Sequence, residues 1–413
     1  MKYKVITAAV LGALLSTTVS ANFIEDAKVS LNLRNFYFDR SYDQDRQAAF
    51  GSWTQGANLV FESGYTDTPI QVGLDASIRY AVLLDSAHRQ TSDLIVPYDA
   101  ARGELESHYA KYGATLKLKA GNTELKVGEL LPRTPIVYFD DSRQLVTSLA
   151  GVMLENKDIE NLKITAGRIT RSNARNDDKY RKLSMQTAGP VKESDGVNLF
   201  GLDYQLDPQL SSSYWFGQLE DIYRQHYVGI NYKTQLDQTK LKFDLSYFYN
   251  EEDGDAYYGK IDSQVVGGMT TVQHNNHLFT AGLQKNIGDS SVPLLTGFSP
   301  QPFLQAWSIL PFNNPEESIW HFSYIYDFKD LGLPGVKTRF AYHHGDGIQR
   351  AGLPDNKEIE RVFSLLYNPT QGWLKGLGFE WRYTDADIKY GAGLEQGKSF
   401  EEHRLITSYT FKF

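Results

Sequence analysis

The sequence predicts an all-β fold: a transmembrane antiparallel β-barrel of about 18 strands with an inward-folded constriction loop. Three observations predict it. The chain ends in a strand-like segment whose last residue is aromatic, it begins with an export signal, and the alternating pattern of the last segment recurs through the interior. Alternation with a period of two marks a strand with one apolar and one polar face.

Residues 1–21 predict a signal peptide. Two lysines precede a short apolar run from Val5 to Leu15, and the small residues Val-Ser-Ala follow at 19–21. This order is typical of a cleaved secretory signal, and the apolar run is too short to cross a bilayer as a helix. We therefore expect an exported chain in which residues 22–413 form a single transmembrane β-barrel.

Composition agrees with a barrel. The 413 residues include 26 Tyr, 22 Phe and 6 Trp but no cysteine, while the mean hydropathy is only −0.41. Barrels direct apolar groups outward and polar groups inward, so the average is polar while aromatic girdles raise the Tyr and Phe content. The net charge of −8 falls to about −10 without the two signal-peptide lysines, which argues against nucleic acid as a partner.

The C-terminal segment and five interior segments carry the alternation. From His403 to Phe413, one face holds Leu405, Thr407, Tyr409, Phe411 and Phe413. The interior segments that repeat this pattern are residues 71–80, 240–250, 319–328, 336–345 and 378–388. A soluble sandwich would show the same alternation with its aromatic face as the core. The number of such segments favours closure into a barrel, which removes exposed strand edges.

Two proline-containing segments interrupt the alternation. The first runs from Leu130 to Ser148, and its prolines exclude it from a central strand. We predict that it folds into the lumen as a constriction, for which the candidate residues are Tyr138, Asp140, Asp141 and Arg143. The second, from Val292 to Ser318, contains five prolines and fits an inward loop or a surface loop equally well.

Arginines recur on the polar faces. The candidate substrate-binding residues are Arg34, Arg79, Arg143, Arg168, Arg339, Arg382 and Arg404. The planar guanidinium pairs with carboxylates and keeps its charge, so a row of them would pass an anion from site to site. Strict alternation puts Arg168 on the apolar face, so either a bulge shifts it toward the lumen or it lies above the membrane band. Each arginine could instead be the structural partner of a nearby acidic side chain.

Several long segments resemble the OprD-type substrate-specific porins, also called outer-membrane carboxylate channels. The likeness extends from Phe23 to Phe413, and the segments that carry it are residues 23–40, 123–145, 166–176, 218–230 and 326–346. The resemblance implies an 18-stranded barrel with an inward third loop and a ladder of basic side chains along one wall. It also implies passive uptake of small water-soluble compounds that carry a carboxylate.

We therefore expect a porin of the bacterial outer membrane for selective diffusion of small carboxylates: aromatic acids, aliphatic acids or amino acids. Its expected partners are these solutes and outer-membrane lipid, and we expect a monomer or weak oligomer. We expect no cofactor and no metal. We also expect no enzymatic activity: in the cluster of His343, His344 and Asp346 the two histidines lie on opposite faces at a strand end, whereas a hydrolase needs a nucleophile and a base oriented by a third group. The alternatives are a non-channel barrel, either an adhesin or an enzyme, and a soluble periplasmic β-protein.

Overall fold

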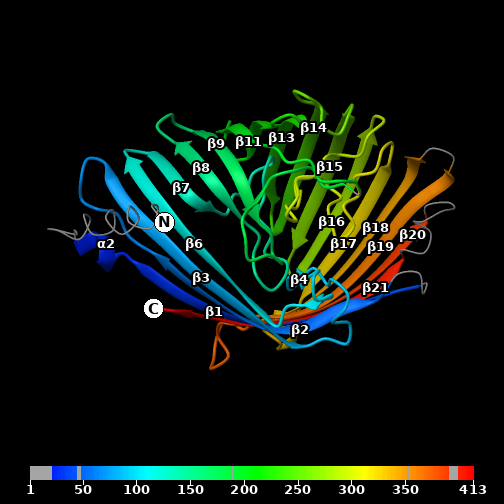
Figure 1. Ribbon diagram of the computed structural model, residues 1–413, viewed down its shortest axis with the longest axis horizontal. Coiled ribbons are helices and arrows are strands. Elements are labelled where there is room, and N and C mark those ends of the chain that lie inside the picture. The colour runs from blue at the N-terminus through cyan, green and yellow to red at the C-terminus, as the bar shows by residue number, and fades with distance from the viewer. Residues whose placement is uncertain (1–20, 44–47, 188, 351–352, 390–398) are drawn as a thin grey trace.

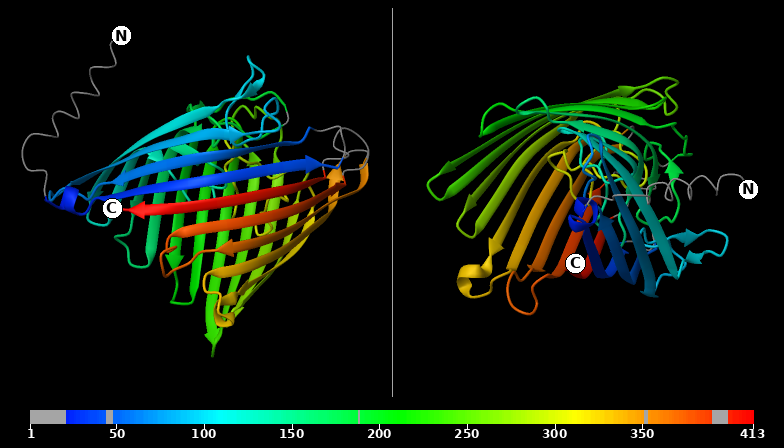
Figure 2. Two further views of the ribbon diagram at one scale, coloured as in Figure 1. Left: turned by 90° about the horizontal axis from the view of Figure 1, so that it is seen from below. Right: turned by 90° about the vertical axis from the view of Figure 1, so that its left-hand side faces the viewer.

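The chain forms a closed antiparallel barrel. The structure is a computed structural model that describes residues 21–43, 48–187, 189–350, 353–389 and 399–413. Eighteen strands of at least eight residues make one sheet in these ranges, and its first and last strands pair with each other (Figures 1 and 2). The predicted fold class is confirmed. The predicted signal peptide lies outside the described residues as far as residue 20.

The strands follow one another round the wall in sequence order. They are β1 (Lys28–Tyr42), β2 (Phe50–Glu62), β3 (Gln71–Asp85), β6 (His108–Ala120), β7 (Thr123–Leu130), β8 (Ser148–Asn156), β9 (Leu162–Asn173), β11 (Val197–Gln205), β12 (Leu210–Leu219), β13 (Tyr223–Leu236), β14 (Thr239–Glu252), β15 (Asp262–His274), β16 (His277–Ile287), β17 (Ser318–Asp327), β18 (Val336–Arg350), β19 (Leu353–Tyr367), β20 (Leu377–Lys389) and β21 (Phe400–Lys412). The connections hold the short strands β4 (Tyr98–Asp99), β5 (Glu104–Leu105) and β10 (Arg181–Lys182), and the 3-10 turn η1 (Phe328–Leu331). Helix α2 (Ala21–Glu25) precedes β1. The interior segments expected to be strands lie in β3, β14, β17, β18 and β20, except that Phe328, the last residue of the segment 319–328, begins η1.

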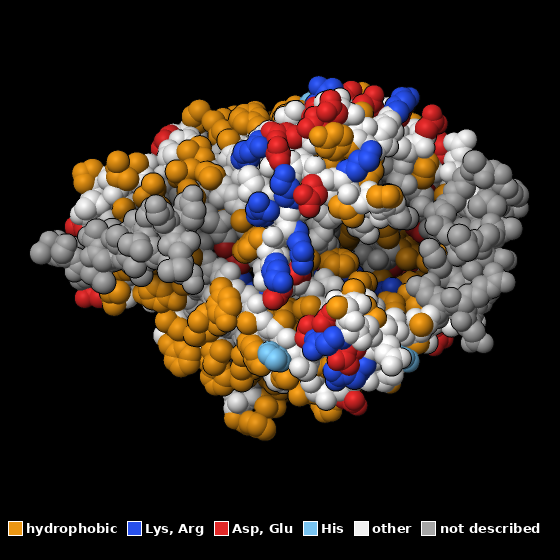
Figure 3. All heavy atoms as spheres, viewed as in Figure 1, with side chains coloured by type: hydrophobic (Ala, Val, Ile, Leu, Met, Phe, Trp, Pro, Cys, Tyr) orange, Lys and Arg blue, Asp and Glu red, His pale blue; other side chains and the backbone are white. Residues whose placement is uncertain are grey.

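The alternation places apolar side chains on the outside of the barrel. Leu245 is 58% exposed, Leu283 68% and Phe340 45%, although each lies near the middle of its strand. Hydrophobic side chains gather on the left of the face in Figure 3, while charged side chains run down its middle. A soluble β-protein would bury these residues, so their exposure fits a lipid-facing wall. No helix in the described ranges is long and apolar enough to cross a membrane.

The two rims differ in the length of their connections. Only two residues join β6 to β7, β13 to β14 and β15 to β16 at one rim. At the other rim, residues 131–147 follow β7 and residues 288–317 follow β16. Short turns are typical of the periplasmic rim of outer-membrane barrels and long loops of the extracellular rim. We call residues 131–147 the first inward loop and residues 288–317 the second inward loop, because both pack inside the wall.

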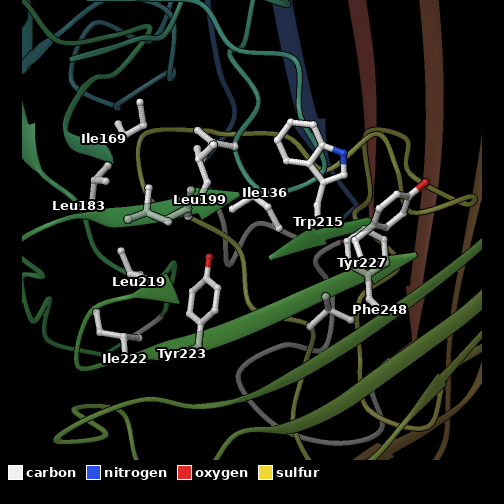
Figure 4. Packing of buried hydrophobic residues seen from close by; sticks show 14 of the residues in the cluster. Ile136, Ile169, Leu183, Leu199, Trp215, Leu219, Ile222, Tyr223, Tyr227 and Phe248 are labelled. Carbon is white, nitrogen blue, oxygen red and sulfur yellow. The ribbon is translucent and has the colours of Figure 1, made fainter. Parts of the chain in front are cut away.

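The first inward loop docks on an apolar part of the inner wall. Ile136 packs between Leu199 of β11 and Trp215 of β12, close to Tyr227 of β13 (Figure 4). Gly217 permits this approach, since a Cβ there would lie 2.2 Å from Cγ2 of Ile136. Burial of these apolar side chains is favourable through the hydrophobic effect, and it holds the loop against the wall.

The two inward loops also bind each other. Nε2 of Gln301 donates to the carbonyl of Pro135 at 2.7 Å, and Oγ of Ser299 donates to the carbonyl of Tyr138 at 2.7 Å. Gln301 is buried, so its hydrogen bond is shielded from water and contributes more than an exposed one. The loops therefore form one structure in the barrel, facing the wall built by β18 to β21 and β1.

Candidate functional site

Three arginines lie in one row across the inner wall. The strand register pairs Arg339 of β18 with Ser364 of β19, Ser364 with Arg382 of β20, and Arg382 with Arg404 of β21. Arg404 in turn lies opposite Phe38 of β1. Adjacent strands are about 4.8 Å apart, so the three guanidinium groups start from backbone positions spread over roughly 14 Å. Like charges so close together require neighbouring anions.

Two carboxylates supply part of that compensation. Glu402 has a fully buried side chain and bonds both Arg404 and Arg40, with 2.9 Å between its Oε2 and Nε of Arg40. Glu380 accepts a 2.8 Å hydrogen bond from Nε of Arg382. A buried charge is costly without a partner, so these acidic side chains allow the arginines to remain in the lumen.

The first inward loop adds further charged groups. Oδ2 of Asp140 lies 2.6 Å from Nη1 of Arg175, and the backbone N–H of Ser142 donates to Oδ1 of Asp140 at 2.8 Å. Burial works to raise the pKa of Asp140, but Arg175 and the hydrogen bonds from Ser142 hold that pKa below its usual range. Arg143 is buried with its guanidinium 5.2 Å from the ring centre of Phe38. It forms no ion pair with a carboxylate in the described part of the chain.

Arg34 holds the same loop from β1. Its Nη1 donates to the carbonyl of Asp141 at 3.0 Å and also to the carbonyl of Arg143. In return, Nε2 of Gln144 donates to the carbonyl of Arg34 at 3.0 Å. Gly56 leaves room for this contact, because a Cβ there would be 2.3 Å from Nε2 of Gln144. Arg34 therefore faces the lumen and positions the loop.

A cavity of about 520 Å³ lies between the inward loops and the arginine row. Its volume suits a small organic solute. Its charged lining residues are Arg40, Asp140, Asp141, Arg143, Arg175, Arg339, Arg382 and Arg404. Aromatic side chains and prolines complete the lining, and these are Tyr138, Phe139, Phe298, Pro300, Pro302, Trp307 and Pro311. Six arginines line the cavity against two aspartates, and Glu380 and Glu402 bond three of these arginines, so a smaller excess of positive charge remains. We call it the arginine cavity.

Comparison with known proteins identifies the family. Residues 21–413 match the family model described as outer membrane porin, OprD family. The chain belongs to the OprD family of outer-membrane porins. It is therefore a channel-forming barrel of the bacterial outer membrane rather than an enzyme.

Individual relatives agree with this assignment. The porin-like protein GalP of Pseudomonas putida is 29% identical over 405 residues, which cover 98% of this chain and 96% of GalP. Acinetobacter baumannii OccAB4 superposes with a TM-score of 0.88 at 36% identity, over 94% of this chain and 98% of OccAB4. Pseudomonas aeruginosa OpdK, solved with vanillate, superposes with a TM-score of 0.88 at 32% identity, over 95% of this chain and all of OpdK.

Arg79 of this OprD-family porin faces the lumen but lies apart from the arginine cavity. It forms two hydrogen bonds with Glu129, at 2.6 Å and 3.0 Å, and is only 3% exposed. It borders a separate cavity of about 430 Å³ that shares no lining residue with the arginine cavity. Arg79 thus fits the alternative in which an arginine is the structural partner of a nearby acidic side chain.

Arg168 does not lie in the lumen, contrary to our expectation. Its neighbours Gly167 and Ile169 on β9 face inward, and Ile169 is completely buried. Arg168 instead bonds Glu220, with 2.9 Å between Nη2 and Oε2, and donates to Oδ1 of Asn198 at 2.8 Å on the outer face. The irregularity in the pairing of β8 and β9 comes after Arg168 in the chain, so it does not turn this side chain inward.

Two arginines of the cavity, Arg40 and Arg175, are not among the predicted substrate-binding residues. Arg40 lies on the same face of β1 as Arg34, so the alternation alone indicates that its side chain points into the lumen. Arg175 follows the end of β9, where no periodic pattern indicates direction. For Arg175 only the fold brings the residue to Asp140. Among the described residues, no three His, Asp or Glu side chains gather as a metal ion would require.

Proposed function

We propose that this porin mediates passive, substrate-selective diffusion of small carboxylate-bearing molecules through an arginine-lined lumen. The observation that carries the proposal is the excess of arginines over acidic side chains around the arginine cavity. A guanidinium presents a planar set of donors that matches the two oxygens of a carboxylate. Confined between low-dielectric walls, the excess charge raises the local concentration of anions.

The row of arginines supports a stepwise passage. The wall presents three arginines in sequence, Arg339, Arg382 and Arg404. Arg382 and Arg404 already bond acidic side chains. This competition weakens their hold on a solute, and conduction requires that each site attract the solute yet release it. Arg143 and Arg339 form no ion pair with a carboxylate in the described residues, and we propose that they bind most strongly.

We propose that the first inward loop constricts this passage. Tyr138, Asp140, Asp141 and Arg143 border the same cavity as the wall arginines. Acidic groups that face basic groups across a narrow opening create a transverse field, which orients a dipolar solute. The aromatic side chains beside them favour a carboxylate with a flat apolar body. The vanillate bound to OpdK, an aromatic carboxylate, supports this class of solute.

We further propose that residues 1–21 are removed as a signal peptide and that one barrel forms one channel. The lipid-facing apolar residues would then contact the lipid of the outer membrane directly. Transport needs no cofactor, because diffusion runs down the solute gradient.

A swelling assay with proteoliposomes tests the function. Vesicles containing the mature protein should swell several-fold faster in benzoate than in benzamide, which has the same shape without the charge. Arg143→Ala and Arg382→Ala should reduce the benzoate rate selectively while the barrel stays folded. Equal swelling rates for benzoate and benzamide in the native protein would contradict the selectivity for carboxylates. Unchanged benzoate rates in both variants would contradict the role of the arginines.

A further inference from the structure

A group of lysines lies near the periplasmic rim, away from the arginine cavity. Lys233 of β13 pairs directly with Lys242 of β14 in the strand register, and Lys240 lies two residues before Lys242. Directly opposed residues on one face have Cβ atoms about 5 Å apart. Two like charges at that separation destabilise a sheet, so their presence calls for a compensating anion.

The alternation of β14 shows that these lysines face the lumen. Phe243 and Leu245 point outward and are 39% and 58% exposed, whereas Asp244, two residues after Lys242, is buried. Ser246, on the face of Asp244, accepts a 3.1 Å hydrogen bond from Gln305 of the second inward loop. Lys240 and Lys242 share this inward face.

Acidic side chains neutralise only part of the group. Nζ of Lys242 lies 2.8 Å from Oδ1 of Asp244. Lys233 and Lys240 form no ion pair with any described residue. The groove beside them has a volume of about 440 Å³ and contains no Asp or Glu among its lining residues, which are Gln209, Lys233, Thr234, Gln235, Lys240, Leu241, Lys242, Thr271, Gln273 and Leu278. Its potential is therefore positive.

This groove is a different place from the arginine cavity. The two share no lining residue. Three strands, β15 to β17, separate β14 from Arg339 on β18 along the wall. A solute that leaves the arginine row toward the periplasm must pass the level of these lysines, since they lie at the rim of short turns.

We propose that Lys233, Lys240 and Lys242 form an exit site that binds the carboxylate group of a solute at the periplasmic end of the channel. The identity of the ligand as a carboxylate rests on the proposed function, whereas the position of the three lysines follows from the strand register. Lysine suits an exit, because its ammonium is strongly hydrated and sits on a flexible stem. Such a site draws anions from the arginine row and releases them to water.

Single-channel recording with benzoate as the probe tests the exit site. Benzoate added on the periplasmic side of the native protein should interrupt the current, and Lys233→Gln with Lys242→Gln should lower the association rate from that side about threefold to tenfold. The rate from the extracellular side should change less than twofold. Lys233→Arg with Lys242→Arg keeps the charge and should retain the native rate.

Lys157→Gln with Lys375→Gln is the matched control. It removes two exposed lysines from other turns of the same rim and leaves the groove intact. An unchanged association rate in the Lys233 and Lys242 double variant, or an equal loss in the control, would overturn the exit site.

The reversal potential in a potassium chloride gradient separates this proposal from the proposed function. Loss of Lys233 and Lys242 should shift selectivity toward cations more than the control does, whether or not benzoate interrupts the current. A native channel indifferent to benzoate but with this shift would refute carboxylate selectivity and keep an anion site at the lysines. No shift and no rate change would refute the site itself.

Discussion

Arg339 differs from its neighbours in the row because it has no carboxylate partner in the described residues. Arg382 bonds Glu380, and Arg404 bonds Glu402. A hydrogen bond to a charged group contributes about 1.5 kcal/mol or more, which is roughly tenfold in affinity. Arg339→Gln should therefore shorten the residence of benzoate in the channel about tenfold. Current interruptions in single-channel records measure this time directly.

Arg361→Gln provides the control for Arg339. Arg361 lies on the adjacent strand β19 but faces outward, where its Nη1 is 2.7 Å from Oδ2 of Asp385. The substitution removes the same charge from the neighbouring strand and leaves the lumen unchanged. An effect of equal size in both variants would contradict a direct contact between Arg339 and the solute.

Glu402 stabilises the barrel more than its single charge suggests. It is the partner of both Arg40 and Arg404, and all three side chains are largely buried. Removing one member of a buried ionic group leaves the others uncompensated and costs about 3–5 kcal/mol. Glu402→Gln should lower the unfolding free energy by this amount, measured as the urea concentration that abolishes the heat-modifiable gel shift. Asp385→Asn, in the exposed outer pair, should cost less than about 1 kcal/mol.

Among the elements, the first inward loop depends on a buried lysine of β6. Nζ of Lys111 donates to the carbonyls of Val146, Asn173 and Ala174, at 2.6 Å, 2.9 Å and 2.8 Å. All three protons of the ammonium group are thereby used, and the loop is tied to the end of β9. Lys111→Met keeps the volume of the side chain but loses these bonds.

Lys111→Met should therefore loosen the first inward loop without unfolding the barrel. We expect a higher mean conductance, more current noise and weaker discrimination between benzoate and benzamide. Lys119→Met, on the same strand and only half-buried, should leave all three unchanged. Native conductance and noise in Lys111→Met would show that the apolar docking of Ile136 is sufficient to hold the loop.

The second inward loop ends in a buried carboxyl group. Glu317 is completely buried, its Oε2 accepts from the backbone N–H of Asn314 at 3.1 Å, and it lies over Gly345, where a Cβ would be 2.0 Å from Oε1. Burial and the neighbouring Glu358 hold the pKa of Glu317 far above its usual 4.5. The folded state thus keeps a proton that the unfolded state loses.

The stability of the barrel should consequently fall as pH rises above about 4.5, because over that range the native state binds more protons than the unfolded state. Glu317→Gln should flatten this decline between roughly pH 5 and pH 9. Unfolding temperatures across that range measure it. Glu316→Gln should leave the decline in place, since the backbone N–H of Gly288 and nearby Lys285 hold the pKa of Glu316 below its usual range. A decline identical in all three proteins would exclude Glu317 as its source.

The sequence predicts which way a side chain points in a strand, because alternation alone sets that direction. It placed Arg34, Arg339, Arg382 and Arg404 on the inner face, where the structure has them. It also put Arg168 on the apolar face, and a bulge was needed to predict otherwise. Loops have no such rule. The contact of Asp140 with Arg175 depends on three-dimensional packing, and no spacing in the sequence indicates it.

At the scale of the whole molecule, the barrel divides its inner wall between two tasks. Apolar side chains from β8 to β15 hold the inward loops, while β1 and β18 to β21 present the basic groups. The loops are thereby pressed toward the arginines, and the cavity forms between them. Closure of the sheet makes this division possible, since β1 and β21 bring the two ends of the chain into one charged surface.

Single-channel conductance of the refolded mature protein, with carboxylates added to one side of a planar bilayer, tests whether the barrel is a carboxylate-selective channel. We expect discrete openings that benzoate and related carboxylates interrupt and that benzamide does not. Silent bilayers would contradict it if a heat-modifiable gel shift shows that the barrel is folded and inserted. Openings that carboxylates and neutral amides affect equally would contradict it as well.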